Sequence, residues 1–174
     1  MWTWFLLGFL CALAVALVAC YFKFAALHKQ VLKIQNKLDM QLRKRRNLIP
    51  PLALTAAGLP ELGASFSYSL QQLPDQALRA GSLAKQAAVE IDLSKALHEL
   101  FAAAAKHPEF QKDAYFQRLY QDLIRTENRI QYTKRRYNSA VRDYNTLTGV
   151  VPLNVLAGLL DFKPFEYFDF EKSL

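Results

Sequence analysis

Residue types that often do chemistry are present in this chain, but their spacing favours no reaction. The three histidines, His28, His98 and His107, lie far apart, and none has a second histidine or a cysteine at metal-ligand spacing. The sequence contains no G-x-S-x-G turn, no glycine-rich phosphate loop and no H-E-x-x-H motif. We therefore expect no enzyme activity, no catalytic residue, no metal site and no cofactor.

Two pairs of closely spaced acids could in principle supply a general acid and a general base. They are Glu90 with Asp92, and Asp169 with Glu171. Because each residue turns a helix by about 100°, side chains two positions apart point to different sides. We therefore predict that both pairs lie on a solvated surface. The aromatic residues between 162 and 170 are interpreted as core rather than as a ligand cage.

Ion pairing is the chemistry that the sequence favours most. Large apolar residues recur at a spacing of seven, which is typical of a helix packed along its length against another. They are Phe116, Leu123, Ile130, Tyr137 and Tyr144. Glu127 and Lys134 fall on this apolar face. In the preceding part of the chain, Arg45 falls on a similar stripe marked by Leu38, Leu42 and Ile49.

A lone buried charge costs several kcal/mol, whereas a paired charge is tolerated. The economical inference is a structural pair, Arg45 with Glu127, between two long helices. The alternative is that both lie at the edge of the core and reach water, as long arginine stems often do. Arg135 and Arg136 are expected to point towards solvent. These basic runs favour a solvated face over a nucleic-acid interface.

The elements that position these residues begin with an apolar segment. Residues 2–22 carry no charge, and at about 1.5 Å per residue a helix of this length spans a hydrocarbon core of roughly 30 Å. Trp2 and Trp4 at one end, and Tyr21 at the other, suit the two interfaces. The segment is therefore predicted to be a transmembrane anchor, residues 1–22.

Two alternatives to a retained span remain. A cleaved signal peptide requires a basic stretch before its apolar part, and none is present. The second is a lipid-anchored, periplasm-facing adaptor, because "LVAC" resembles a bacterial lipobox in which Cys20 would carry the lipid. The missing upstream basic residue argues against this reading as well.

Basic residues gather directly after the span. The net charge of +7 is carried entirely by residues 23–46, which hold eight basic residues and one acid. The positive-inside rule then predicts a short amino terminus outside and a cytoplasmic carboxyl-terminal domain. The basic side chains should also contact an anionic lipid surface. The expected lipid contacts are Lys23, Lys29, Lys33, Lys37, Arg43, Lys44 and Arg46.

Apolar periodicity predicts an all-α domain, since no segment alternates with a period of two. A basic juxtamembrane helix, residues 23–49, should continue from the span and stop or kink at "IPPL". The next part of the chain, 50–81, reads as broken helical segments punctuated by proline and glycine. Further helices are expected over about 74–106, with a restart near Gly81, over about 110–148, and over the short "PLNVLAGLL". Pro108 suits a first helical turn.

Three collinear blocks resemble the LemA family: "LDMQLRKRRNLIP", "RTENRIQYTKRRYNSAVRDYNT" and "PLNVLAGLLDFKPFEYFD". The chain departs from that family at Asn47, where an acid is usual, at Gln35, where a tryptophan is common, and in 51–80, which lacks a long charged helix. The resemblance implies an antiparallel helical bundle on a membrane anchor, without known enzyme activity. Some relatives are associated with magnetosome membranes.

The expected architecture is thus an amino-terminal transmembrane helix followed by an elongated antiparallel bundle over residues 23–174. The expected function is a non-enzymatic scaffold or interaction protein in membrane organisation. The membrane is the one partner that the sequence indicates. The sequence identifies no protein partner and leaves self-association open. It does not favour nucleic acid as a partner.

Overall fold

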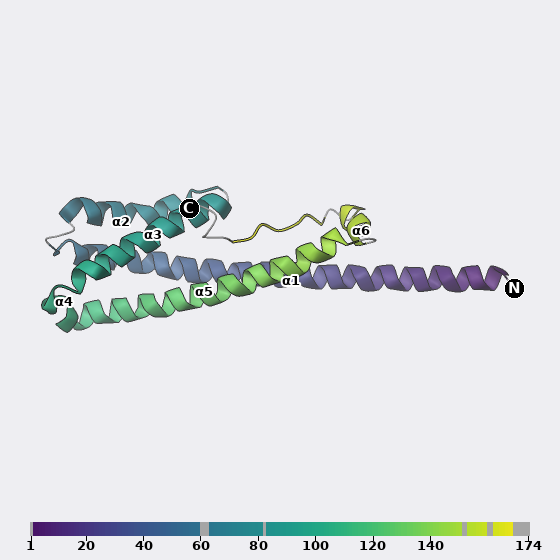
Figure 1. Cartoon of the computed structure of the whole chain (residues 1–174), viewed down its shortest axis with the longest axis horizontal. Coiled ribbons are helices and arrows are strands. Elements are labelled where there is room, and N and C mark those ends of the chain that lie inside the picture. Colours follow the sequence, from purple (N-terminus) through teal and green to yellow (C-terminus); the bar gives the residue numbers. More distant parts are fainter. Residues whose placement is uncertain (1, 60–62, 82, 151–152, 160–161, 169–174) are drawn as a thin grey trace. The chain divides into compact units, whose positions relative to one another are not determined.

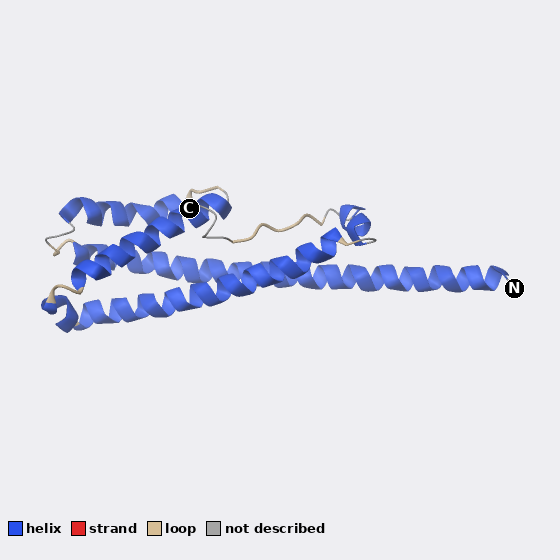
Figure 2. Ribbon diagram, in the orientation of Figure 1, coloured by secondary structure: helices blue, strands red, loops and turns tan. Residues whose placement is uncertain are grey.

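The computed structural model describes residues 2–59, 63–81, 83–150, 153–159 and 162–168. Within these ranges all regular structure is helical, as the sequence predicts (Figure 2). The helices, labelled in Figure 1, are α1 (Trp2–Ala56), α2 (Gly63–Leu78), α3 (Leu83–Ala104), α4 (Pro108–Lys112), α5 (Ala114–Gly149) and α6 (Leu153–Leu159).

The chain divides into two compact units. The first unit is Met1–Asn36 with Arg136–Tyr167, and the second is Lys37–Arg135 with Phe168–Leu174. Helices α1 and α5 each contribute residues to both units. Their apolar stripes are buried as the spacing of seven predicts, with Ile130 and Tyr144 fully buried.

The core of the second unit is built from α1, α2, α3 and α5. Its buried residues include Leu52 of α1, Leu70 of α2, Leu97 of α3 and Leu123 of α5. Several helices share this core because each one presents an apolar stripe that water would otherwise contact.

In the first unit, an aromatic cluster packs the tail segment, residues 162–167, against α1 and α5. The rings of Phe24 and Phe162 stack at 5.5 Å, and Tyr144 meets Phe165 edge-on at 5.0 Å. Asn145 holds the backbone of Phe165 through two hydrogen bonds of 2.9 and 3.0 Å. These contacts place Phe162 and Phe165 in the packing of the first unit, as predicted, whereas Tyr167 is exposed.

Helix α1 does not stop at its two prolines, so of the two predicted outcomes, a stop or a kink, the stop is wrong. It continues through Pro50 and Pro51 to Ala56, although each proline removes a backbone donor. The residues on either side, Ile49, Leu52 and Ala53, are fully buried. Their burial offsets the lost hydrogen bonds, so packing overrides the local signal.

Two other boundaries also differ from the prediction. Pro74 lies inside α2 rather than at a helix start, while the restart near Gly81 is confirmed, since α3 begins at Leu83. Helix α5 begins at Ala114 because Asp113 caps it, accepting the N–H of Tyr115 at 2.7 Å. Pro108 opens the separate helix α4, as expected.

Candidate functional site

The guanidinium of Arg45 is buried in the second unit, where residues of α1, α3 and α5 surround it. Its Nη1 donates to Glu127 Oε1 at 2.7 Å and to Ser94 Oγ at 2.9 Å. Its Nη2 donates to the backbone oxygen of Glu90 at 3.1 Å and to the carboxylate of Glu90. One side chain therefore links three helices.

Glu90 is a partner that the sequence analysis missed. It was expected on a solvated surface, but its exposed fraction is 0%. Its carboxylate accepts from Arg45 and, at 3.0 Å, from Arg46 Nη1. The available signal was that Glu90 occupies a core position of the spacing that continues through Leu93, Leu97 and Leu100. Asp92, two residues on, is exposed.

Arg46 was expected to face lipid, and this prediction is wrong. Only 7% of the residue is exposed, because its side chain turns towards Glu90 of α3. The sequence prediction considered a single apolar stripe on α1, and therefore a single helix packed against it. A helix that packs against both α3 and α5 buries a wider arc, and Arg46 lies in that arc.

The cluster is electrically balanced, with Arg45 and Arg46 opposite Glu90 and Glu127. Burial alone would lower the pKa of Arg45, but the nearby Glu90 and Glu127 carboxylates outweigh it and raise that pKa. The guanidinium therefore stays charged. Because every charged side chain in this cluster already has a partner of opposite charge, the cluster is suited to fixing the register of the three helices.

Burial also shifts the pKa of Asp39, which lies six residues before Arg45 on α1. Desolvation raises the pKa of this carboxyl above its usual value, while Arg43 and Arg46 partly counter the effect. Its ionised form is therefore less favourable in the folded protein than in water.

Two open cavities line the surface of α3 and α5 beside the cluster. One, of about 530 Å³, has Arg45 in its wall together with Lys95 and Gln131. The other, of about 560 Å³, is lined by Glu127, Phe101 and other residues of the two helices. Ser94 and His98 contribute to both. Their walls mix apolar and polar groups.

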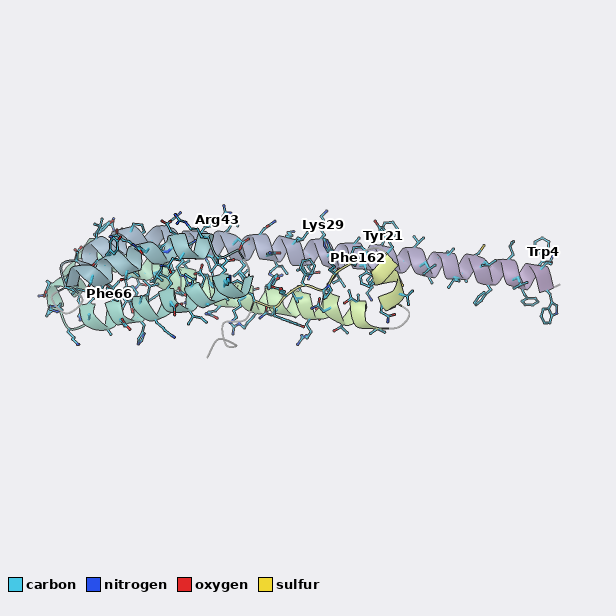
Figure 3. All side chains as sticks on the ribbon, turned by 90° about the horizontal axis from the view of Figure 1, so that it is seen from above. Trp4, Tyr21, Lys29, Arg43, Phe66 and Phe162 are labelled. Atoms are coloured by element: carbon cyan, nitrogen blue, oxygen red, sulfur yellow. The ribbon has the colours of Figure 1, made fainter. Side chains whose placement is uncertain are left out.

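The other expected lipid-facing residues of α1 are exposed: Lys23, Lys29, Lys33, Lys37, Arg43 and Lys44. Figure 3 labels two of them, Lys29 and Arg43. These six side chains are accessible to an anionic surface, in contrast to Arg46.

The structure does not bring the histidines together. His28 packs among aromatic rings of the first unit, with Phe165 at 5.2 Å. His107 meets Glu109 at 3.0 Å, and His98 lines the cavities beside the Arg45 cluster. No group of three potential metal ligands occurs among the described residues.

The apolar segment forms the beginning of α1. This helix is long and apolar enough to cross a membrane, and the apolar stretch is entirely uncovered by the rest of the chain. Trp2, Trp4 and Tyr21 are exposed near its ends. Length, composition and exposure together make it a candidate membrane span.

Comparison with known proteins agrees with the helical architecture and the sequence blocks. A search of curated proteins gave no match. The model of the LemA family matches residues 34–174, which include the Arg45 cluster, α2 to α6 and the tail segment. That family is not a known enzyme family. The match covers most of the chain, and the protein belongs to the LemA family.

Proposed function

We propose that this protein is a membrane-anchored scaffold, without catalytic activity, that presents its helical bundle to partners at the cytoplasmic face of the membrane. One observation carries the proposal. Helix α1 runs without interruption from the exposed apolar segment to Arg45 and on to Ala56. The same helix is thus both the anchor and a wall of the bundle.

The distribution of charge supports this orientation. Six accessible basic side chains follow the span on α1, and no charged residue precedes them. Basic residues next to a span are retained on the cytoplasmic side and are attracted to anionic lipid, by about 1 kcal/mol for each residue near the surface.

A role in binding rather than catalysis is supported by how the charged residues are used. Arg45, Arg46, Glu90 and Glu127 are bound to one another. Exposed side chains of α3 and α5, such as Lys95 and Asn128, line open cavities instead. Membrane organisation, including the magnetosome type that the family resemblance implies, is the corresponding process.

Site-specific photocrosslinking in intact membranes tests the scaffold proposal. A photoreactive residue at Asn128, on an exposed cavity wall of α5, should give adducts of discrete mass that disappear when the membrane is dissolved before irradiation. Ile130 is the matched control, because it lies two residues away and is fully buried. Absence of discrete adducts at Asn128 and at every other exposed cavity position would contradict the proposal.

A further inference from the structure

The region around α6 combines an uncharged sequence with exposed apolar side chains. Residues 146–160 contain no charged residue, and Asp143 and Asp161 are the nearest charges on either side. Val155 on α6 is 62% exposed, and Val150, just after α5, is 48% exposed. Transfer of such exposed apolar side chains out of water lowers the free energy.

Contacts within the first unit determine where this region lies along α1. The N–H of Phe162 donates to the backbone oxygen of Ala157 in α6 at 2.9 Å. The ring of Phe162 stacks on Phe24 with centroids 5.5 Å apart and ring planes 8° apart. Figure 3 shows Phe162 beside the part of α1 that carries Tyr21. Helix α6 is therefore tied to α1 at Phe24.

Phe24 lies directly at the end of the apolar span. It follows Phe22 by two residues, or about 3 Å along a helix. The polar interfacial layer on each side of the hydrocarbon core is roughly 5–7 Å thick. Phe24 and the stacked Phe162 therefore fall within that layer when residues 2–22 span the core.

Two further contacts hold the tail segment in this position. Tyr137 donates its hydroxyl to the backbone oxygen of Glu166 at 2.9 Å, and Asn145 binds both backbone groups of Phe165. Phe162 is thus held to α1, and Phe165 and Glu166 are held to α5. The depth of α6 follows from the packing of the first unit.

We propose that α6, together with Val150, forms a second membrane contact that lies in the interfacial layer of the bilayer that α1 spans. The occupant of this apolar surface is lipid, because the surface is continuous with the span through the Phe24–Phe162 stack. An uncharged segment with the exposed apolar side chains of Val150 and Val155 is suited to the layer that borders the hydrocarbon core. The contact would hold the carboxyl end of α5 at the membrane.

This inference rests on the membrane anchor of the proposed function, so the experiment measures both. The full chain, with Cys11→Ser and Cys20→Ser, is reconstituted into vesicles of neutral and anionic phospholipid. A single cysteine carries an environment-sensitive fluorophore, at Val155→Cys, Leu10→Cys or Arg142→Cys. Arg142 is the matched control, because it is an exposed residue of α5 in the same unit.

Lipids with a nitroxide near the headgroup should quench the label at position 155, whereas aqueous iodide should quench it several-fold less than the label at position 142. The label at position 10 should be quenched only by nitroxides deep in the acyl chains. Equal iodide quenching at positions 155 and 142, with position 10 still protected, would overturn the α6 contact alone. Iodide access to position 10 would overturn the anchor itself.

A second copy of the chain could also shield Val155 from water. Dilution to one protein per vesicle distinguishes shielding by lipid from shielding by a second copy, since lipid contact is independent of protein density. Loss of protection on dilution would overturn the proposal in favour of self-association. With the label at Asn154→Cys, adding Val150→Asp and Val155→Asp should raise iodide quenching to the level of position 142, and unchanged protection would also overturn it.

Discussion

At the scale of single residues, Glu90 is the centre of the buried cluster. It is fully buried and faces two guanidinium groups, while Glu127, the partner expected from the sequence, keeps a 30% exposed side chain. Removing Glu90 would leave Arg45 and Arg46 with one carboxylate between them. Removing Glu127 leaves Arg45 with Glu90, and water can reach the site.

The first prediction is that Glu90→Ala destabilises the protein by about 3–5 kcal/mol and Glu127→Ala by about 1 kcal/mol. Arg45→Ala should fall between them, because Glu90 then retains Arg46. Denaturant unfolding of the full chain in detergent micelles measures these differences. The double variant of Arg45 and Glu127 should cost less than the sum of the single variants.

Matched controls for this series lie on the same helices. Glu99 is an exposed acid of α3 and Arg135 an exposed base of α5, and their alanine variants should change the free energy of unfolding by no more than about 0.5 kcal/mol. Additive effects at Arg45 and Glu127 would mean that the two side chains are not coupled. Equal losses for Glu90→Ala and Glu99→Ala would mean that the cluster is not buried.

The second prediction concerns Asp39, whose pKa is raised in the folded protein by burial. An acid with a raised folded pKa binds protons more readily when folded, so its contribution to stability falls as pH rises from the unfolded pKa through the folded one. Asp39→Asn removes that loss. The variant should therefore melt at a higher temperature than the parent at pH 7.

The melting temperatures of the parent and Asp39→Asn should converge below about pH 3.9, where the carboxyl is protonated in both states. Comparing the two proteins at each pH removes the contribution of all other titrating groups. A destabilised Asn variant at pH 7 would show that Arg43 and Arg46 outweigh the desolvation of this carboxylate.

At the scale of elements, α2 and α3 are separated by a turn that depends on Gly81. This residue has a φ of 67°, in the left-handed region that side chains disfavour. An added Cβ would meet nothing closer than the backbone oxygen of Arg79 at 4.0 Å, so the cost of a substitution is conformational rather than steric.

The third prediction is that Gly81→Ala lowers stability by about 1–2 kcal/mol. Gly81→Asn should cost less, since asparagine tolerates the left-handed region better than other residues. Gly149, at the end of α5, is the control, because a Cβ there meets nothing within 4 Å and its φ is not positive. Thermal unfolding followed by circular dichroism measures all three. Equal melting temperatures for Gly81→Ala and the parent would contradict a required left-handed turn.

The apolar periodicity of α1 and α5 could be predicted from the sequence because each stripe repeats over many turns. The path of α1 through Pro50 and Pro51 could not, since it depends on burial of Ile49 and Leu52 against other helices. Arg46 was misplaced for a related reason. A helical wheel shows which side of one helix is apolar, but not how many neighbours cover that helix.

At the scale of the whole molecule, the accessible basic residues of α1 predict a salt-sensitive contact with anionic lipid. A chain that begins at Lys23 should bind acidic vesicles, and Arg43→Gln with Lys44→Gln should weaken this binding because both side chains are exposed. Vesicle sedimentation at two salt concentrations measures the effect. Equal binding to neutral vesicles would contradict an electrostatic contact.

Arg46→Gln separates lipid binding from folding within the same basic run. Arg46 is buried against Glu90, so its substitution should lower stability while leaving vesicle binding of the folded protein nearly unchanged. A loss of lipid affinity as large as that of Arg43→Gln with Lys44→Gln would show that Arg46 contacts lipid.

The last prediction concerns the side of the membrane on which the bundle lies. All eight basic residues between 23 and 46 follow the apolar span, so the positive-inside rule predicts a cytoplasmic carboxyl end. A carboxyl-terminal reporter that is active only outside the cytoplasm should therefore remain inactive, and one that is active only inside should be active. The opposite result would favour the lipid-anchored alternative, in which Cys20→Ser releases the protein from the membrane. Retention of the Cys20→Ser variant in the membrane, together with a cytoplasmic carboxyl end, would leave α1 as the anchor.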